Sequence, residues 1–399
     1  MPRFEPFRAL RYVDDGDDLD DLVAPPYDVL SSRDVAALAS RSPHNIVHVD
    51  VPDGGDDRYQ RAAERLEHWI ADGVLRSDDA ESFTIYRMRF TDATGADRNL
   101  VGVLGGLEVV DEGAGGVLPH ERTTPKASTD RLDLTRATAA NLSPIWGLSL
   151  AGGLTDLLRE PGERVGHVTV DGVDHVVERV TDPSRVASIR DHIAPHDVLI
   201  ADGHHRYGIS RTYRNEVRAT TGHADGPAEQ TLAFVGELVA DQLSVEAIHR
   251  LYTGATAAEL MATLGACFDV EPIEHPTPAT LAAMERDGFL VFVGPAGCYR
   301  MTARPGAFDR VRSLDGAWLE HGLGDSPVEV TYQHGLDEAV AAVADGNAAA
   351  AVLIRPVSVA EIERTAREGV LMPPKSTFFT PKLRTGFVIR PLERCGAEV

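Results

Sequence analysis

Apolar residues recur along this chain with two periods, one typical of helices and one typical of strands. The helical period predicts helices at 58–70, 132–141, 183–193, 205–218, 257–264, 278–285, 337–344 and 359–368. Alternating positions or short apolar runs predict strands at 83–90, 98–110, 166–170, 175–180, 197–201, 231–238, 289–293, 328–332, 351–354 and 386–390. Because helices and strands follow one another irregularly, we expect an α+β fold with mixed sheets and packed helices rather than a doubly wound sheet.

Polar segments interrupt this pattern and suggest how the chain is organised. The loop GHADGP follows the helix predicted at 205–218, and we place a provisional boundary there. The division gives an N-terminal α+β region at 1–225 and a C-terminal α+β region at 226–399. Polar motifs occur on both sides of this boundary, so we expect distant stretches to converge on one site, with the loop near residue 375 returning to it.

Composition narrows the classes of partner. The chain has 399 residues and a net charge of −23, a field that repels nucleic acid and requires any anionic ligand to be held by a local cationic pocket. Three dispersed cysteines form neither a disulfide framework nor a CxxC metal pair, as is typical of a reducing compartment. No export signal and no apolar run long enough to span a bilayer is present. We therefore expect a cytoplasmic protein that binds neither membranes nor nucleic acid; the sequence does not indicate its oligomeric state.

The junction between the strand at 197–201 and the helix at 205–218 carries the strongest chemical signal, in the segment IADGHHRY. A strand that turns directly into a helix presents backbone N–H groups and the positive end of the helix dipole, which together favour a phosphate. The carboxylate here suits a metal ion or a proton, and the imidazoles can exchange protons near neutral pH. These predicted site residues are Asp202, Gly203, His204, His205 and Arg206. A plain helix cap with surface histidines is the simpler alternative.

Lysine is rare in this chain, and all three lysines among the 39 basic residues lie in polar motifs. Lys126 belongs to HERTTPKASTDR, which also offers His120 and Glu121 as general-base candidates. Lys375 and Lys382 belong to MPPKSTFFTPK, where Ser376 and Thr377 add hydroxyl groups. The latter segment is not a P-loop, because it lacks the glycines and its prolines remove N–H groups. A rigid loop that directs ammonium groups at an anion remains a possible role, and a structural turn is the alternative.

Four motifs in order resemble a widespread prokaryotic family, domain of unknown function 1015. They are APPYDV, HERTTPKASTDR with ANLSPIWGL, IADGHHRY and MPPKSTFFTPKL, and they cover essentially the whole chain. Membership of this family implies no activity. The APPYDV segment itself reads as a rigid extended stretch that either holds Asp28 in a pocket or forms a structural turn.

A second resemblance is local. The strand, DGHHR turn and helix are similar to the nucleotide-phosphate turn of the ParB/sulfiredoxin-like superfamily, which includes partition CTPases, sulfiredoxin and free-serine kinases. The resemblance implies that Gly203, His204, His205 and Arg206 contact nucleotide phosphates. His204 replaces the cysteine that sulfiredoxin chemistry requires, and the net charge of −23 disfavours a DNA-partition role.

This second resemblance implies a nucleotide-binding phosphotransferase, a small-molecule kinase of the free-serine type. It would use ATP or ADP with Mg²⁺ and act on a hydroxylated amino acid or a similar metabolite, so the partner is a small anionic or phosphorylated molecule. The expected roles are a base in His120 or Glu121, a metal ligand in Asp202 or Glu121, Asp202 as a second base candidate, and clamps in Lys126, Lys375 and Lys382. Two alternatives stay open. One is a metal-dependent hydrolase with ligands from Asp202, His204, His205, His120 and Glu121, and the other is a non-catalytic nucleotide-binding regulatory protein.

Overall fold

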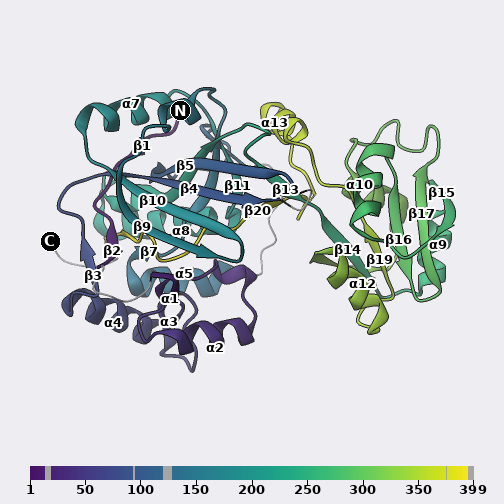
Figure 1. The fold of residues 1–399 in the computed structure, drawn as a ribbon, viewed down its shortest axis with the longest axis horizontal. Coiled ribbons are helices and arrows are strands. Elements are labelled where there is room, and N and C mark those ends of the chain that lie inside the picture. The colour runs from purple at the N-terminus through teal and green to yellow at the C-terminus, as the bar shows by residue number, and fades with distance from the viewer. Residues whose placement is uncertain (14–18, 93–94, 120–127, 374, 394–399) are drawn as a thin grey trace. The chain divides into compact units, whose positions relative to one another are not determined.

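The computed structural model describes residues 1–13, 19–92, 95–119, 128–373 and 375–393 (Figure 1). By its contacts the chain separates into two units. Unit 1 holds Met1–Pro119 together with the described residues of Thr123–Leu243 and Pro381–Val399. Unit 2 holds the described residues of Ser244–Thr380. The division into 1–225 and 226–399 stays a prediction, and the contacts of the strand at Gln230–Glu237 lie within unit 1.

Unit 1 is built around a mixed nine-stranded sheet in the described part of the chain. The main path of this sheet runs in the order β6-β11-β8-β12-β5-β4-β10-β9, and β1 pairs with β5. The strands are β1 (Phe4–Glu5), β4 (Phe83–Thr91), β5 (Asp97–Glu108), β6 (Val117–Pro119), β8 (Ile145–Ser149), β9 (Glu163–Val170), β10 (Val173–Val180), β11 (Val198–Asp202) and β12 (Gln230–Glu237). Short pairs outside it are β2 (Leu10–Tyr12) with β3 (Leu75–Ser77), and β7 (Ala140–Asn141) with β21 (Arg390–Pro391).

Helices flank this sheet, and α5 packs against both α4 and α8 (Figure 1). The helices of unit 1 are α1 (Leu19–Leu22), α2 (Ser32–Arg41), α3 (Val47–Asp50), α4 (Arg58–Ala71), α5 (Ser128–Thr138), α6 (Leu154–Leu157), α7 (Pro183–Ile193) and α8 (His204–Thr221), with 3-10 turns η1 (Tyr27–Val29) and η3 (Pro227–Glu229). The apolar face predicted for α4 is real, because Ala62, Leu66 and Trp69 are its buried residues and belong to one core cluster. This packing brings α3, α5 and the beginning of α8 around one pocket.

Unit 2 is a six-stranded sheet with helices on both faces, in the order β15-β17-β16-β19-β14-β18. Its elements are β13 (Ser244–Glu246), β14 (Ile248–Thr253), α9 (Ala257–Leu264), β15 (Phe268–Ile273), α10 (Pro278–Asp287), β16 (Leu290–Gly294), β17 (Gly297–Ala303), α11 (Asp315–Leu323), β18 (Glu329–His334), α12 (Leu336–Ala344), β19 (Ala350–Leu353), α13 (Val359–Glu368) and β20 (Phe378–Thr380). Successive side chains of a strand face opposite sides. Leu290 and Phe292 therefore pack with α9 and α11, whereas Val291 and Val293 pack with α10 and α12.

The sequence patterns predicted the class of fold and most of these elements. The mixed α+β architecture is confirmed, and helices α7, α9 and α13 have the bounds that the helical period predicts. The strand predicted at 386–390 is largely wrong. Only Arg390–Pro391 forms a ladder, and Ile389 makes an isolated bridge to Leu10, although residues 386–390 are buried. The apolar run there reflects burial of side chains rather than strand pairing.

Candidate functional site

The junction between β11 and α8 begins the candidate site. Residues 198–201 of β11 are buried between β6, which runs parallel to it, and β8, which runs antiparallel. Gly203 then adopts a left-handed conformation with φ of 87°, which favours glycine. A Cβ at this position would lie 3.1 Å from both Ile145 Cγ2 and Arg206 Nε. The strand therefore turns within one residue into the 18-residue helix α8, whose N-terminal end carries partial positive charge.

Asp202 ends β11 and is held by cations on both sides of the turn. Its Oδ1 accepts a hydrogen bond of 2.9 Å from the backbone N–H of Gly203. Its Oδ2 accepts from Lys382 Nζ at 3.2 Å and from Arg206 Nη2 at 3.4 Å. Burial alone would raise the pKa of this carboxyl, but Lys382 and Arg206 together hold the pKa below its ordinary value. Asp202 is therefore an anion at neutral pH and is balanced by two cations.

The remaining residues of the DGHHR turn lie in the first turn of α8. His204 is buried and His205 is half-buried. Arg206 also donates from Nη1 to the carbonyl of Pro144. The structure thus brings Asp202, Arg206 and Lys382 into direct contact around the turn at Gly203, with the two histidines next to them in the chain. What each residue does with a ligand stays a prediction.

The other predicted site residues fall into two groups. His120, Glu121 and Lys126 lie outside the described residues. The remaining three, Lys375, Ser376 and Thr377, belong to unit 2 and are described within it.

In unit 2 the MPPKST loop is tightly bonded. Lys375 is exposed and has a φ of 56°, a left-handed conformation that is strained for a residue with a Cβ. Its carbonyl accepts a hydrogen bond of 3.0 Å from Arg250 Nη1. Ser376 and Thr377 are buried, and Ser376 Oγ donates to the carbonyl of Pro373 at 2.7 Å. The Ser376 hydroxyl therefore donates its proton to a carbonyl of its own loop.

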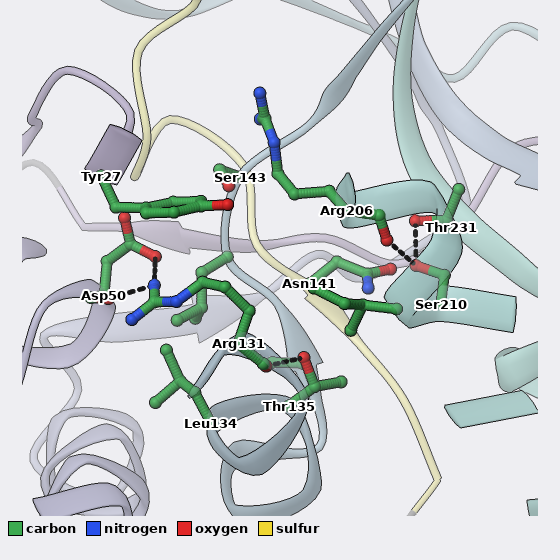
Figure 2. A pocket seen from close by; sticks show the side chains of 13 residues that line it. Tyr27, Asp50, Arg131, Leu134, Thr135, Asn141, Ser143, Arg206, Ser210 and Thr231 are labelled. Carbon is green, nitrogen blue, oxygen red and sulfur yellow. Dashed lines mark hydrogen bonds and ion pairs between the residues drawn. The ribbon is translucent and has the colours of Figure 1, made fainter. Parts of the chain in front are cut away.

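A small pocket opens where α3, α5, β7 and α8 meet in unit 1, with a volume of about 50 Å³ (Figure 2). Arg131 from α5 stacks its guanidinium 4.4 Å from the centre of the Tyr27 ring. It also donates from Nη1 to the carbonyl oxygen of Asp50 at 2.5 Å and to Asp50 Oδ1 at 3.3 Å. Asn141 and Arg206 line the pocket as well, so Arg206 belongs both to this pocket and to the Asp202 cluster.

Sequence reasoning missed most of this pocket. The APPYDV segment was expected to place Asp28 in a pocket or to form a turn; it forms the short turn η1, Tyr27 lines the pocket and Asp28 is exposed. Asp50 had no motif around it. The available signal was a single carboxylate at the end of the apolar run IVHVD, where an aspartate is expensive to bury without a partner.

Two absences concern only the residues that the structure describes. No group of three or more His, Cys, Asp and Glu side chains suited to a metal ion is found among them. The hydrolase ligands Asp202, His204 and His205 therefore do not form such a group with one another, and His120 and Glu121 are outside this description. In the same part of the chain, no helix has the length and apolar character needed to cross a bilayer.

Comparison with models of protein families shows which family the chain belongs to. The model described as "Protein of unknown function (DUF1015)" matches residues 4–317. The chain belongs to the DUF1015 family. This match confirms the family resemblance and contains the first three of the four motifs, whereas MPPKSTFFTPKL at 372–383 lies beyond it. The family description names no activity. None of the curated proteins matches this DUF1015 chain.

Solved structures show distant likeness to this DUF1015 protein. A conserved hypothetical protein from Pyrococcus furiosus is 13% identical with a TM-score of 0.39, over 69% of this chain and 92% of its own. A free serine kinase in complex with AMP is 12% identical with a TM-score of 0.39, over 70% and 88% of the two chains. SbnI with a C-terminal truncation, from Staphylococcus aureus, is 11% identical with a TM-score of 0.39, over 72% and 87%.

Proposed function

We propose that this DUF1015 protein binds a nucleotide at the beginning of α8 and transfers a phosphoryl group to a hydroxylated amino acid or a similar small metabolite. One observation carries the proposal. An ionised Asp202 lies between Lys382 and Arg206 at the point where a buried strand turns into an 18-residue helix. Phosphoryl transfer needs fixed cations for the phosphate oxygens and a carboxylate for the accompanying metal ion.

The phosphate side of the proposal rests on three kinds of positive group. The N-terminal end of α8 favours an anion through the helix dipole. Arg206 is anchored by the carbonyl of Pro144 and offers a planar fork. Lys382 places a compact ammonium charge 3.2 Å from Asp202 Oδ2, and a lysine stem can follow a phosphoryl group as it is transferred. In a chain with a net charge of −23, a pocket of this kind is needed to hold a nucleotide.

The metal side rests on Asp202. Magnesium is usually held by one or two carboxylates, with phosphate oxygens and water in the other positions. A single ionised Asp202 beside a phosphate site fits that requirement without a dedicated metal cluster. When bound with the nucleotide, Mg²⁺ would neutralise charge on the phosphate oxygens. The low pKa of Asp202 keeps it available as a ligand at neutral pH and makes it a weak base, so we assign the base role to His120 or Glu121.

In the proposed step the acceptor oxygen forms a bond to the terminal phosphorus of ATP or ADP. The bond from that phosphorus to its bridging oxygen breaks, and ADP or AMP leaves with the electron pair. The hydroxyl proton of the acceptor passes to the base. Lys382 and Arg206 stabilise the charge on the transferring group and on the leaving nucleotide.

The test is direct. The protein is incubated with Mg²⁺, with ATP or ADP, and with serine, threonine or homoserine, and the mixture is followed by phosphorus NMR. We expect a new phosphomonoester resonance that grows as the nucleotide loses its terminal phosphate. If the nucleotide binds but no new resonance appears, the kinase hypothesis is wrong and a regulatory nucleotide-binding protein is favoured. Stoichiometric zinc or manganese in the purified protein, with no stabilisation by nucleotide, would favour the hydrolase instead.

A further inference from the structure

The pocket between α3, α5 and α8 has a chemical character different from that of the Asp202 cluster. It combines one carboxylate, Asp50, with two guanidinium groups, Arg131 and Arg206. Figure 2 shows Tyr27, Asp50 and Arg131 on one side of it and Asn141 on the other. A ligand that carries only one sign of charge would leave the groups of the other side of this pocket unpaired.

Asp50 is the least satisfied group in this pocket. Only 3% of the residue is exposed, and its Oδ2 is buried without a hydrogen-bond partner in the described part of the chain. Its Oδ1 is engaged by Arg131. Burial raises the pKa of Asp50, although Arg131 and Arg206 oppose the rise. A buried carboxylate oxygen without a donor is destabilising, so a ligand that supplies a charged N–H donor gains from meeting it.

The other groups in the pocket are mainly donors. Asn141 uses its Oδ1 to accept a hydrogen bond of 3.0 Å from the backbone N–H of Leu232, which orients its amide. Tyr27 and Ser143 bring hydroxyl groups to the same space. Arg131 is fixed by Asp50, Asp130 and the Tyr27 ring, so its guanidinium is pre-organised. Donors and guanidinium groups in this number suit a carboxylate.

We propose that this pocket binds a small zwitterion, an α-amino acid of about the size of serine, with its ammonium group on Asp50 and its carboxylate toward the guanidinium groups. The pocket is small, with a volume of about 50 Å³, so we commit to a small molecule as its ligand. Arg206 lines the pocket and also contacts Asp202, so the pocket adjoins the phosphate site. The role of this amino acid as phosphoryl acceptor rests on the proposed function; its binding does not.

Binding is tested without nucleotide by calorimetry on the full-length protein. The probes are L-serine, ethanolamine, which lacks the carboxylate, and 3-hydroxypropionate, which lacks the ammonium group. We expect serine to bind and each analogue to bind at least about tenfold more weakly, since each leaves one charged side of the pocket unpaired. This series needs no variant, so it does not depend on whether a substituted protein folds. Equal binding of the three, or no binding up to about 10 mM, would overturn the proposal.

Two variants sharpen the assignment. Asp50→Asn keeps an oxygen for Arg131 and removes the charge, and we expect it to reduce serine affinity at least about tenfold. Asp57→Asn is the matched control, because Asp57 is exposed and forms an ion pair with Arg61, four residues further along the chain. Serine binding that survives Asp50→Asn would contradict the pocket even if phosphoserine forms. If serine binding depends on Asp50 but no phosphomonoester forms in the NMR experiment, the amino-acid pocket is supported and the kinase function is contradicted.

Discussion

The DGHHR turn of unit 1 and the MPPKST loop of unit 2 are both polar motifs, but they differ in the hydrogen bonds and ion pairs that their polar atoms make. In the first, the side chains of Asp202, Arg206 and Lys382 are directed at one another around a helix N-terminus. In the second, Ser376 bonds its own loop through Pro373, and the backbone of Lys375 is fixed by Arg250. Side-chain charges meet in the turn, whereas hydrogen bonds to backbone carbonyls organise the loop.

The difference shows why a polar motif is not yet a site. A hydroxyl that holds a loop together is not free to donate the same proton to a ligand. Charges that balance one another at a surface-accessible turn can instead exchange partners when a charged ligand arrives. In the MPPKST loop the exposed ammonium of Lys375 is the group with this freedom, and its strained backbone is the kind of feature found at ligand sites.

The largest expected effect is on turnover. Asp202→Asn removes the carboxylate proposed to hold the metal ion, and we expect phosphoryl transfer to fall by about 10²- to 10⁴-fold, the range typical of a lost catalytic group. The rate of phosphomonoester formation measures this. Asp57→Asn serves again as the control for an unrelated carboxylate. A turnover rate close to that of the unsubstituted protein would show that Asp202 has no catalytic role. The DGHHR turn would then differ from the MPPKST loop in its ion pairs but not in function.

The second prediction concerns stability, and it compares substitutions at two glycines, one at the turn and one inside α8. Gly203→Ala forces a Cβ into a left-handed residue that is already close to Ile145 and Arg206, and we expect a loss of about 1–2 kcal/mol in the free energy of unfolding. Gly208→Ala, inside α8 and with no atom within 4 Å of the new Cβ, should stabilise the protein by up to about 1 kcal/mol. Chemical denaturation measures both. Equal effects would mean that the turn at Gly203 is not constrained.

The third prediction sets Lys382 directly against Ser376. Lys382→Ala should weaken ADP binding about tenfold, because a cation beside the phosphate site is lost. Ser376→Ala should leave ADP affinity within about twofold and lower stability by about 1 kcal/mol, the cost of the lost hydrogen bond. Calorimetry measures the ADP affinity of each variant, and chemical denaturation measures the free energy of unfolding of each. A larger loss of affinity in Ser376→Ala than in Lys382→Ala would reverse the comparison.

Sequence reasoning succeeded where the signal was local. The helical period predicted α7, α9 and α13 with their observed bounds. The strands predicted at 166–170 and 175–180 form the β9–β10 hairpin, and Asp171 and Gly172 at its turn both have positive φ. The strand-to-helix turn at Gly203 was also local. The strand prediction was wrong for residues 386–389, because an apolar run of this kind occurs both in paired strands and in buried irregular segments.

The pocket was beyond a sequence pattern for a different reason. Asp50, Arg131 and Asn141 come from three separate elements, and nothing along the chain states that they meet. Their meeting depends on how α3, α5 and α8 pack. The pairing of Lys382 with Asp202 is of the same kind, although the motifs around the two residues made a shared site a reasonable prediction. Long-range convergence is therefore what the structure adds.

The contact between Lys382 and Asp202 joins residues that are 180 positions apart, with all of unit 2 between them. During synthesis, β11 and α8 leave the ribosome long before Lys382 does. At about 5–20 residues per second, the delay is on the order of ten seconds or more. Throughout that interval Asp202 lacks one of its two cations. A chain that stops before residue 382 can complete unit 2 yet never complete this turn, so any ligand that needs Lys382 distinguishes finished molecules from truncated ones.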